Sequence, residues 1–587
     1  MAPEHPGPTG EATSLANSDL SRQSKNERIK AESKGLFFVS DGKGNVHPFL
    51  DEIRLLTSGE RPTISGEAKE ISKFFGIYRQ QARGARGSKT DDHFFMCRIK
   101  NPAGGELTAA QWSALDDAAD LFGDGTLRVT SRQGLQYHHV YGPQLAPLVR
   151  HLSRNYRRDG TLSACGDVNR NVMTSPIDGL EPHHDVRGAE LGHAIAKELA
   201  PRSSAYFQIW LTDEYGQTVA PLNFDEPVYG SQYLPRKFKV GIAHPDDNSI
   251  DVLTQDVGFV PIATHGRSDG SQFDFYSGGG LGLTHNNPTT AALLGLYLGR
   301  VPRAQVVEAT RVIAVLQKEH GERKDRRLAR WKYTLRRLGV ERVKEELRDR
   351  FGLALEDALP QPLPEMNLHL GWHAQRDGRG YYGLSVENGR VHPPLRKAVR
   401  TAVTELGLGV RLTAQQDILL CNISDRAALE RILDAHGVPR PEALSLLRRN
   451  AMACPAKPTC GLAMTEAENI LPHYIHALEN AGYGDIDAVI RMTGCPNNCA
   501  RPVTAEIGIY GYGKNDHVIL VGGARQGSRL AKVLYERIPG DKMVPALLGL
   551  FAVIRARARV GEPVGEFLER TDVAELRAQI GLEGVAS

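Results

Sequence analysis

Two helical segments with the same hydrophobic pattern recur far apart in the chain. Apolar residues spaced three to four apart over Ala109–Gly123 and Leu395–Gly407 predict amphipathic helices. Each segment is followed by alternating apolar and polar positions, over Leu127–Val140 and Val410–Ile423, which predict one short strand apiece. The same order of elements therefore occurs twice.

Later segments contain both the alternating pattern of strands and the three-to-four spacing of helices. Arg236–Ala243 and Ala505–Tyr512 have the pattern of strands, Pro288–Val301 that of a helix, and the apolar run Met543–Ile554 that of a buried helix. Strands and helices alternate in some stretches and segregate in others. We therefore expect an α+β fold rather than a doubly wound parallel sheet.

Short motifs repeat in the same order and indicate an internal duplication. RVTSRQGLQY, which starts at Arg128, returns as RLTAQQDILL, and RNVMTSP, which starts at Arg170, returns as RNAMACP. DVGF at Asp256–Phe259 matches EIGI at Glu506–Ile509, and a GGG at 278–280 matches a GG at 522–523. Each match is weak alone, but four in one order predict two divergent halves.

A charged stretch, Lys318–Arg350, joins the halves. It is helical in pattern and carries 13 Lys/Arg and seven Asp/Glu. A solvated connector helix explains such a run, and a basic face that covers an anionic cofactor is the alternative.

Composition excludes several classes of protein. The 587 residues are 41% hydrophobic and 24% charged, which is ordinary for a globular chain of several structural units. A net charge of +3 argues against a polycation that binds nucleic acid. No apolar run is long enough to span a bilayer, and the first 35 residues have no apolar signal core, so we expect a cytoplasmic protein with a loose N-terminal tail.

Four of the seven cysteines lie within 46 residues, in ACPAKPTCGLA and TGCPNNCARP: Cys454, Cys460, Cys495 and Cys499. Clustered cysteines in a reducing compartment favour metal binding over disulfides. Zinc usually uses C-x2–4-C spacing, whereas the wider C-x5-C here suits a 4Fe–4S cluster. A structural zinc and unligated buried cysteines remain as alternatives.

Basic residues on strand-like segments form a second candidate site. They are Arg98, Arg128, Arg132, Arg170, Lys237 and Lys239. Lys237 and Lys239 lie two apart and would share one face of a strand, which is costly unless solvent or an anion separates them. An exposed basic edge is one interpretation, and a positive pocket for an oxyanion or a polycarboxylate cofactor is the other.

These segments together resemble the assimilatory sulfite and nitrite reductases that carry siroheme and a 4Fe–4S cluster. ACPAKPTCGLA and TGCPNNCARP resemble the family's cluster segments, and FMCRIK, TSRQGLQYHH, ACGDVNRNVM and YLPRKFK resemble its substrate segments, in order from about Phe74 onward. The resemblance implies pseudo-twofold halves made of ferredoxin-like repeats and two larger α/β domains, with the cofactor between the halves.

The resemblance also implies roles for the candidate residues. The four clustered cysteines match cluster ligands, and Cys499 also matches the thiolate that bridges to the siroheme iron. Arg98, Arg170, Lys237 and Lys239 match the cations that bind the substrate anion. Cofactor contacts are implied for Arg128, Arg132, Gln136 and His138. Ser175 stands in the first half where Cys454 stands in the second, so we expect a cluster in only one half.

The resemblance divides the chain into five parts: an N-terminal extension (1–75), a ferredoxin-like half-domain (76–150), a siroheme and substrate domain with the connector (151–350), a second half-domain (351–430) and a cluster domain (431–587). It implies six-electron reduction of sulfite to sulfide, with nitrite reduction to ammonia as the alternative. No convincing dinucleotide motif is present, so a ferredoxin or an NADPH-oxidising flavoprotein subunit would supply the electrons, with ferredoxin slightly favoured. A zinc-stabilised scaffold that binds anions or RNA is the non-enzymatic alternative.

Overall fold

The structure is a computed structural model that describes residues 38–40, 46–83, 89–162, 168–202, 226–230 and 233–582. The expected N-terminal tail and Cys165 lie outside these residues. A small hairpin opens the described part, with β1 at Phe38–Ser40 and β2 at Val46–Pro48.

Two five-stranded sheets have identical topology. The first has the order β11-β10-β9-β8-β7 and the second β21-β20-β19-β18-β17. In each, the three strands that come first in sequence are parallel and the last two are antiparallel to their neighbours. The strands of the first sheet are β7 Met173–Thr174, β8 Val240–Ile242, β9 Val257–Pro261, β10 Gln272–Ser277 and β11 Leu296–Pro302. Those of the second are β17 Met452–Ala453, β18 Ile490–Thr493, β19 Ile507–Gly511, β20 Asp516–Val521 and β21 Lys532–Pro539.

The register of these sheets confirms the duplication residue by residue. Val240 pairs with Val257 in the first sheet, and Ile490 pairs with Ile507 in the second, so equivalent residues here lie 250 positions apart. The loops between these strands correspond as well, because Asp251 (φ 50°) and Arg501 (φ 60°) each precede a 3-10 turn in the left-handed conformation. The repeat inferred from DVGF and EIGI is therefore correct.

Two further sheets carry the ferredoxin-like repeats. One has the order β14-β5-β6-β4-β3, and the other β12-β13-β16-β15. The first combines β3 Ile77–Arg83, β4 Lys89–Ile99, β5 Leu127–Val129, β6 Leu135–Val140 and β14 Arg390–Val391; the second combines β12 Gly371–Ala374, β13 Gly380–Leu384, β15 Gly409–Leu412 and β16 Ile418–Ile423. Strand β14 comes from the second half of the sequence and pairs with β5 of the first, so the halves interlock.

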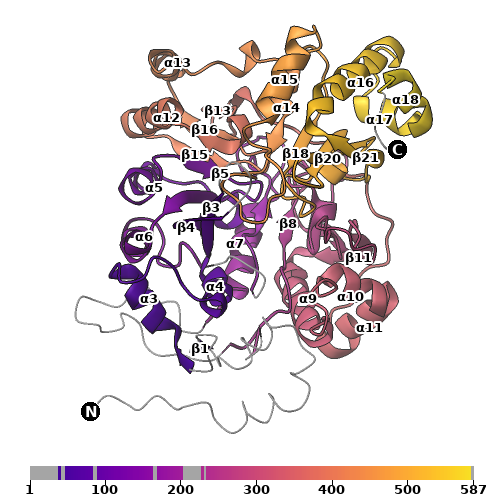
Figure 1. The fold of residues 1–587 in the computed structure, drawn as a ribbon. Coiled ribbons are helices and arrows are strands. Elements are labelled where there is room, and N and C mark those ends of the chain that lie inside the picture. The colour runs from indigo at the N-terminus through magenta and orange to yellow at the C-terminus, as the bar shows by residue number, and fades with distance from the viewer. Residues whose placement is uncertain are drawn as a thin grey trace, which may run out of the picture.

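Helices cover the outer sides of the sheets (Figure 1). In the view of Figure 1, α6, α5, α12 and α13 form a column on one side, and α9–α11 and α16–α18 occupy the opposite side. The first-half helices are α3 Phe49–Thr57, α4 Gly66–Ser72, α5 Ala109–Phe122, α6 Gly142–Asn155, α7 Gly188–Glu198, α9 Val306–His320, α10 Trp331–Leu338 and α11 Val340–Phe351. The second-half helices are α12 Pro393–Leu406, α13 Arg426–Ala435, α14 Leu446–Asn450, α15 Leu471–Asn480, α16 Met543–Arg557, α17 Val564–Arg570 and α18 Val573–Ile580.

The structure corrects three local predictions. Leu127–Val140 and Val410–Ile423 each form a hairpin rather than one strand, because Gln133 (φ 53°) and Gln416 (φ 74°) turn the chain midway. Pro288–Val301 contains no helix, and its second part is β11, which pairs with β10.

The connector differs from the prediction as well. It is divided among the end of α9, a loop that begins at Gly321, and helices α10 and α11, rather than forming a single helix. The break allows the residues around Arg330 to turn inward and become buried.

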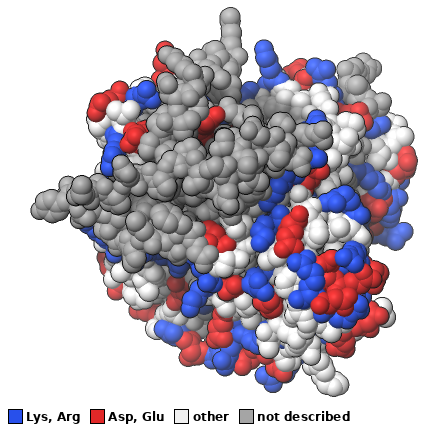
Figure 2. Space-filling model, turned by 90° about the horizontal axis from the view of Figure 1, so that it is seen from below, with Lys and Arg blue, Asp and Glu red and all other residues white. Residues whose placement is uncertain are grey.

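The predicted buried helix at Met543–Ile554 is confirmed as α16, whose apolar residues pack in the core of the second half. Within the described ranges no helix combines the length and apolar character that crossing a bilayer requires. Acidic and basic side chains intermingle over the described part of the face shown in Figure 2. The described part of that face therefore shows no uninterrupted basic surface.

Candidate active site

The two cysteine segments meet because their strands are neighbours. Cys454 directly follows β17, and Cys495 follows β18, which runs parallel to β17. The carboxyl ends of adjacent parallel strands lie at the same sheet edge, so two loops far apart in sequence come together there. The Cys454 N–H donates to the Met492 carbonyl (3.1 Å), and the Gly494 N–H donates to Cys454 Sγ (3.4 Å).

Close backbone contacts fix the geometry of these loops. The N–H groups of Met464 and Thr465 both donate to the Gly494 carbonyl, at 2.7 and 3.1 Å. A Cβ at Gly494 would lie 2.6 Å from Ala456 Cβ, so only glycine fits there. The segment that contains Cys460 is thereby held against the segment that contains Cys495.

The four thiols form one electrostatically coupled group. Burial and the neighbouring cysteines raise the pKa of Cys495 to about 12 and raise that of Cys454 as well. Bound metal would compensate for the cost of holding several thiolates together in a buried place. Cys454 and Cys495 are buried, Cys460 is partly buried, and Cys499 is exposed.

The spacing of the sulfurs separates the metal alternatives. A tetrahedral zinc holds its thiolates about 3.8 Å apart, given Zn–S bonds near 2.3 Å. Among the described residues, no three of these sulfurs come within 4.8 Å of one another. The larger 4Fe–4S cube places each thiolate on a different iron and so holds its thiolates farther apart than zinc does. The positions of these sulfurs therefore do not match a tetrahedral zinc site, and their role as cluster ligands stays a prediction.

The first half has polar residues at the equivalent positions. Ser175 follows β7 as Cys454 follows β17, and Ser249 lies 250 positions before Cys499. Both hydroxyls donate to Asp247 Oδ2, at 2.5 and 2.8 Å. A buried carboxylate therefore binds the two serines that stand where the other half has cysteines. The expectation that only one half holds a cluster stays a prediction.

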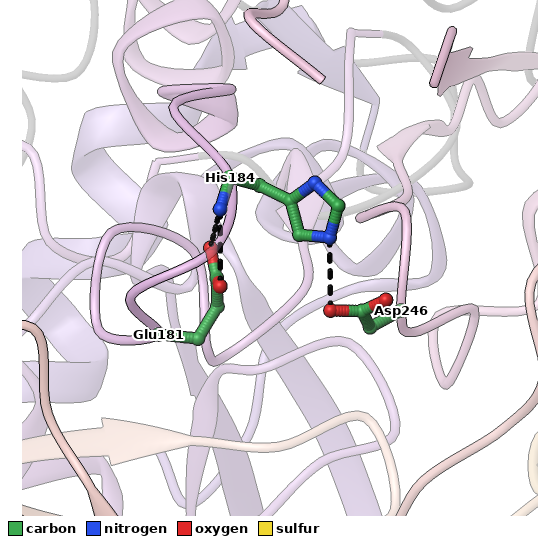
Figure 3. Close-up of side chains that lie close together, drawn as sticks. All are labelled: Glu181, His184 and Asp246. Atoms are coloured by element: carbon green, nitrogen blue, oxygen red, sulfur yellow. Dashed lines mark hydrogen bonds and ion pairs between the residues drawn. The ribbon is translucent and has the colours of Figure 1, made fainter. Parts of the chain in front are cut away.

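Beside Asp247 lies a group of Glu181, His184 and Asp246, whose ligand atoms fall within 4.8 Å of one another (Figure 3). His184 Nδ1 accepts from the Ser268 N–H, so its proton resides on Nε2, which donates to Asp246 Oδ2 (3.0 Å). The His184 nitrogen that faces the carboxylate is thus protonated and cannot bind a cation. The group is a closed hydrogen-bond network.

Arg170 and Lys239 come from adjacent parallel segments. Asn169 and Phe238 form a parallel bridge, and the Arg170 N–H donates to the Phe238 carbonyl (2.9 Å). Lys237 and Lys239 flank Phe238, and all three cations are partly buried. Burial, followed by the positive charges of Arg330 and Arg132, lowers the pKa of Lys239 well below its usual value.

Arg98 approaches from β4. It donates to the Tyr78 hydroxyl (3.3 Å) and, with the Gln136 amide oxygen turned toward it, to Gln136 from Nε (3.2 Å) and Nη2 (3.0 Å). Its charge acts on both Cys460 and Arg132, so Arg98 lies between the cysteine site and the cations. His138 is buried, and its Nε2 lies 3.4 Å from the Gln136 amide oxygen as that amide is placed in the structure.

The turn between β5 and β6 links both sites. The Ser131 hydroxyl donates to the Cys499 carbonyl (2.8 Å), while Arg132 donates to Gln255 Oε1 (2.7 Å) and the Asn171 carbonyl (2.6 Å). Burial and the charge of Arg170 lower the pKa of Arg132 to about 9, with smaller contributions from other arginines. The exposed Cys499 thus lies beside the cation group.

Arg128 has a different environment from Arg132. It is buried, donates to Glu468 Oε2 (2.6 Å) and to the Ala453 carbonyl (2.7 Å), and so holds the residue before Cys454. Arg390 binds the same glutamate from the second half. These contacts indicate that Arg128 stabilises the cysteine loop. A direct contact between Arg128 and a cofactor stays a prediction.

The motifs did not identify Arg330 and Asp256 as parts of this site. Arg330 precedes α10 and contacts Asp256 at 3.4 Å. Arg330 Nε and Arg132 Nε are buried donors without a hydrogen-bond partner, as expected where a multiply charged anionic group binds. The repeat could have indicated Asp256, because an acidic residue stands at the same position in both halves, Asp256 in DVGF and Glu506 in EIGI.

Comparisons with known proteins identify the family of the chain. The family pattern "Nitrite and sulphite reductase 4Fe-4S domain" matches residues 165–355, and "Nitrite/Sulfite reductase ferredoxin-like half domain" matches residues 86–155 and 373–436. The first match covers the copy without the clustered cysteines, which lie at equivalent places in the second copy.

Curated relatives cover nearly the whole chain. "Sulfite reductase [ferredoxin]" of Synechococcus elongatus is 36% identical over 92% of this chain and 90% of the relative. "Sulfite reductase [NADPH] hemoprotein beta-component" of Staphylococcus saprophyticus is 35% identical (94% and 96%), and that of Acidithiobacillus ferrooxidans is 37% identical (93% and 96%). The solved Mycobacterium tuberculosis NirA protein has a similar fold, with TM-score 0.74 and 22% identity over 90% of this chain and 96% of that chain.

A duplicated α+β fold that brings four cysteines close to a group of cations is typical of redox enzymes that reduce small oxyanions. The chain belongs to the nitrite and sulfite reductase family.

Proposed function

We propose that this protein reduces sulfite to sulfide in assimilatory sulfur metabolism, with a 4Fe–4S cluster and siroheme as its cofactors. The proposal rests on one observation: the Ser131 hydroxyl donates to the Cys499 carbonyl, and the next residue, Arg132, belongs to the group of partly buried cations. One site supplies electrons, and the other holds a hard anion next to it. The three sulfite reductases named among the relatives support sulfite over nitrite.

The cysteines Cys454, Cys460, Cys495 and Cys499 would hold the cluster. When bound, the cluster and siroheme together supply single electrons, which six-electron chemistry requires and side chains cannot provide. Arg132 and Arg330, each with a buried donor unpaired, are suited to the carboxylates of siroheme.

Arg98, Arg170, Lys237 and Lys239 would bind the substrate. Their charges compensate for that of sulfite and stabilise negative charge that grows on its oxygens as sulfur–oxygen bonds break. Lys239 is suited to donate protons, because burial and neighbouring arginines weaken its hold on the ammonium proton.

The electrons would come from a partner protein. Relatives of both the ferredoxin and the NADPH type match this chain to a similar degree. No dinucleotide-binding motif follows a strand, so the donor would be a separate protein, and we favour ferredoxin because SACGDVNRNVM resembles the ferredoxin-dependent form. We expect the reaction to occur in the cytoplasm. Turnover with reduced ferredoxin, compared with turnover supplied by an NADPH-oxidising flavoprotein subunit, tests the choice of donor.

The visible absorption spectrum of the purified, reduced chain tests the function. Haem-like and iron–sulfur bands that shift when sulfite is added support the proposal. A colourless, zinc-containing protein from cells that make siroheme would refute it. Bands that respond to nitrite and ignore sulfite would assign the reduction of nitrite to ammonia instead.

A further inference from the structure

Asp256 is a fully buried carboxylate beside three cations, Arg132, Lys239 and Arg330, which together are called the cation pocket. It lies immediately before β9, and its side chain has no exposed surface. Its own carbonyl accepts from the Ser277 hydroxyl (2.8 Å) and the Gly278 N–H (2.9 Å), which fix the backbone at this point. A buried carboxylate is costly unless nearby positive charge compensates for it.

Cations from three separate elements supply that charge. Arg330, at the start of α10, lies with Nη2 3.4 Å from both Asp256 oxygens. The charge of Asp256 also acts on Arg132 in the β5–β6 turn and on Lys239 before β8, opposing the loss of their protons. The carboxylate thus pairs with Arg330 and also compensates in part for the charges of Arg132 and Lys239.

The loop that follows β10 is held by a residue close to Arg330. Lys332, two residues after Arg330, donates to the carbonyls of Gly280 (2.9 Å) and Gly282 (3.0 Å). This loop contacts the cysteine segment, because the Leu283 N–H donates to the Pro496 carbonyl (2.9 Å). Asp256 therefore anchors the start of α10, next to the loop that contacts the cysteine segment.

We propose that Asp256 is a positioning and specificity-determining residue, which orients Arg330 and sets the net charge that the pocket offers to a substrate anion. The inference rests on the proposed function, since it concerns the anion bound there. Asp256 itself is too buried to touch the substrate. Its negative charge offsets one of the surrounding cations and so limits how tightly a multiply charged anion is held.

This role predicts a dependence on the charge of the ligand. Coulomb energy is proportional to the charge of the anion, so a change in the pocket acts twice as strongly on a dianion as on a monoanion. On a logarithmic scale, the shift in affinity for dianionic sulfite should be double the shift for nitrite. A purely structural defect would weaken the binding of both anions, but the logarithmic shift for sulfite would not be twice that for nitrite.

The duplication offers a matched control. Glu506 lies 250 positions after Asp256, directly before β19, and is equally buried. It pairs with Arg525 (3.0 Å) and accepts from the Val489 N–H (2.7 Å), away from Arg132 and Lys239. Glu506→Gln therefore makes the same chemical change at the equivalent position of the other half.

The experiment compares Asp256→Asn, Asp256→Glu and Glu506→Gln as cofactor-loaded enzymes. Dissociation constants for sulfite and nitrite are read from the absorption bands, at a pH where sulfite is dianionic, and kcat and KM are measured separately. For Asp256→Asn we expect nitrite to bind about threefold and sulfite about tenfold more tightly. Asp256→Glu keeps the negative charge and should bind both anions as the wild type does. Glu506→Gln should leave the ratio of the sulfite and nitrite dissociation constants unchanged.

A second variant should change the affinity for both anions in the opposite direction. Arg330→Gln removes a positive charge from the same pair, so, compared at equal siroheme content because Arg330 is also assigned to the siroheme carboxylates, sulfite should bind about tenfold and nitrite about threefold more weakly. If Asp256→Asn does not fold, Arg330→Gln still tests the dependence on the charge of the anion. Equal factors for both anions, or an equal shift in Glu506→Gln, would overturn the inference. A wild-type enzyme whose bands ignore sulfite would instead refute the proposed function.

Discussion

Asp251 binds the two halves together through a fully buried ion pair, and its replacement tests this role. Its Oδ2 lies 3.0 Å from Arg491 Nη1 and 3.0 Å from Arg501 Nη1, both in the second half. Asp251 and Arg491 have no exposed side-chain surface, and Arg501 has 7%. Asp251→Asn keeps the shape but leaves two guanidinium groups buried without their counter-charge.

The size of the effect follows from burial. Removal of one partner from a buried ion pair costs about 3–5 kcal/mol. The unfolding entropy is about 2.1 cal/mol/K per residue, or about 1.2 kcal/mol/K for the whole chain. A loss of about 4 kcal/mol therefore lowers Tm by about 3 °C if the protein unfolds as one unit, and by about 7 °C if each half unfolds separately.

Differential scanning calorimetry of the loaded protein measures this shift. Asp377→Asn is the matched control, because Asp377 forms an exposed ion pair with Arg379 and its loss should leave Tm unchanged. If Asp251→Asn lowers Tm no further than Asp377→Asn does, the buried pair does not hold the halves together.

Three further predictions concern the candidate sites. Cys495→Ser should abolish cluster binding, seen as loss of iron and acid-labile sulfide, and full iron content would contradict its role as a ligand. Lys237→Ala and Lys239→Ala should retain both cofactors but slow sulfite turnover severalfold or more, whereas unchanged turnover would remove them from the pocket. Burial would raise the pKa of Glu181, but hydrogen bonds from His244 and two backbone N–H groups lower it from 4.5 to about 2. Its contribution to stability is thus complete above about pH 5 and is lost as the pH falls toward 2, so Glu181→Gln should flatten the acid limb of a Tm–pH profile.

The sequence predicted the duplication and the cysteine site because both depend on local order. Strand-end motifs such as RNVMTSP and RNAMACP keep their residues wherever the same turn recurs, and they lie at equivalent strands. The two hairpins were missed because their turns, TSRQG and TAQQD, contain polar residues that also fit an alternating strand. Pro288–Val301 has helical spacing, yet pairing with β10 makes its second part a strand.

The buried charge network could not have been predicted from local pattern. Asp251 and Arg491 lie 240 positions apart, and only the approach of the two halves brings them into contact. Arg330 sits in a stretch whose many charges are typical of an exposed helix, and its burial depends on the break between α9 and α10. Such residues are identified by where the fold places them.

Asp251 and Arg501 occupy the same position in the two halves, and they touch each other. Residues at one position on a twofold axis would meet their own copies in a dimer of identical chains, so an acid would face an acid there. Fusion of the two copies into one chain frees each to vary alone, and opposite charges can then face one another. The same freedom allows cysteines in one half and serines in the other, so a nearly symmetric scaffold can build a single site with two chemically different sides.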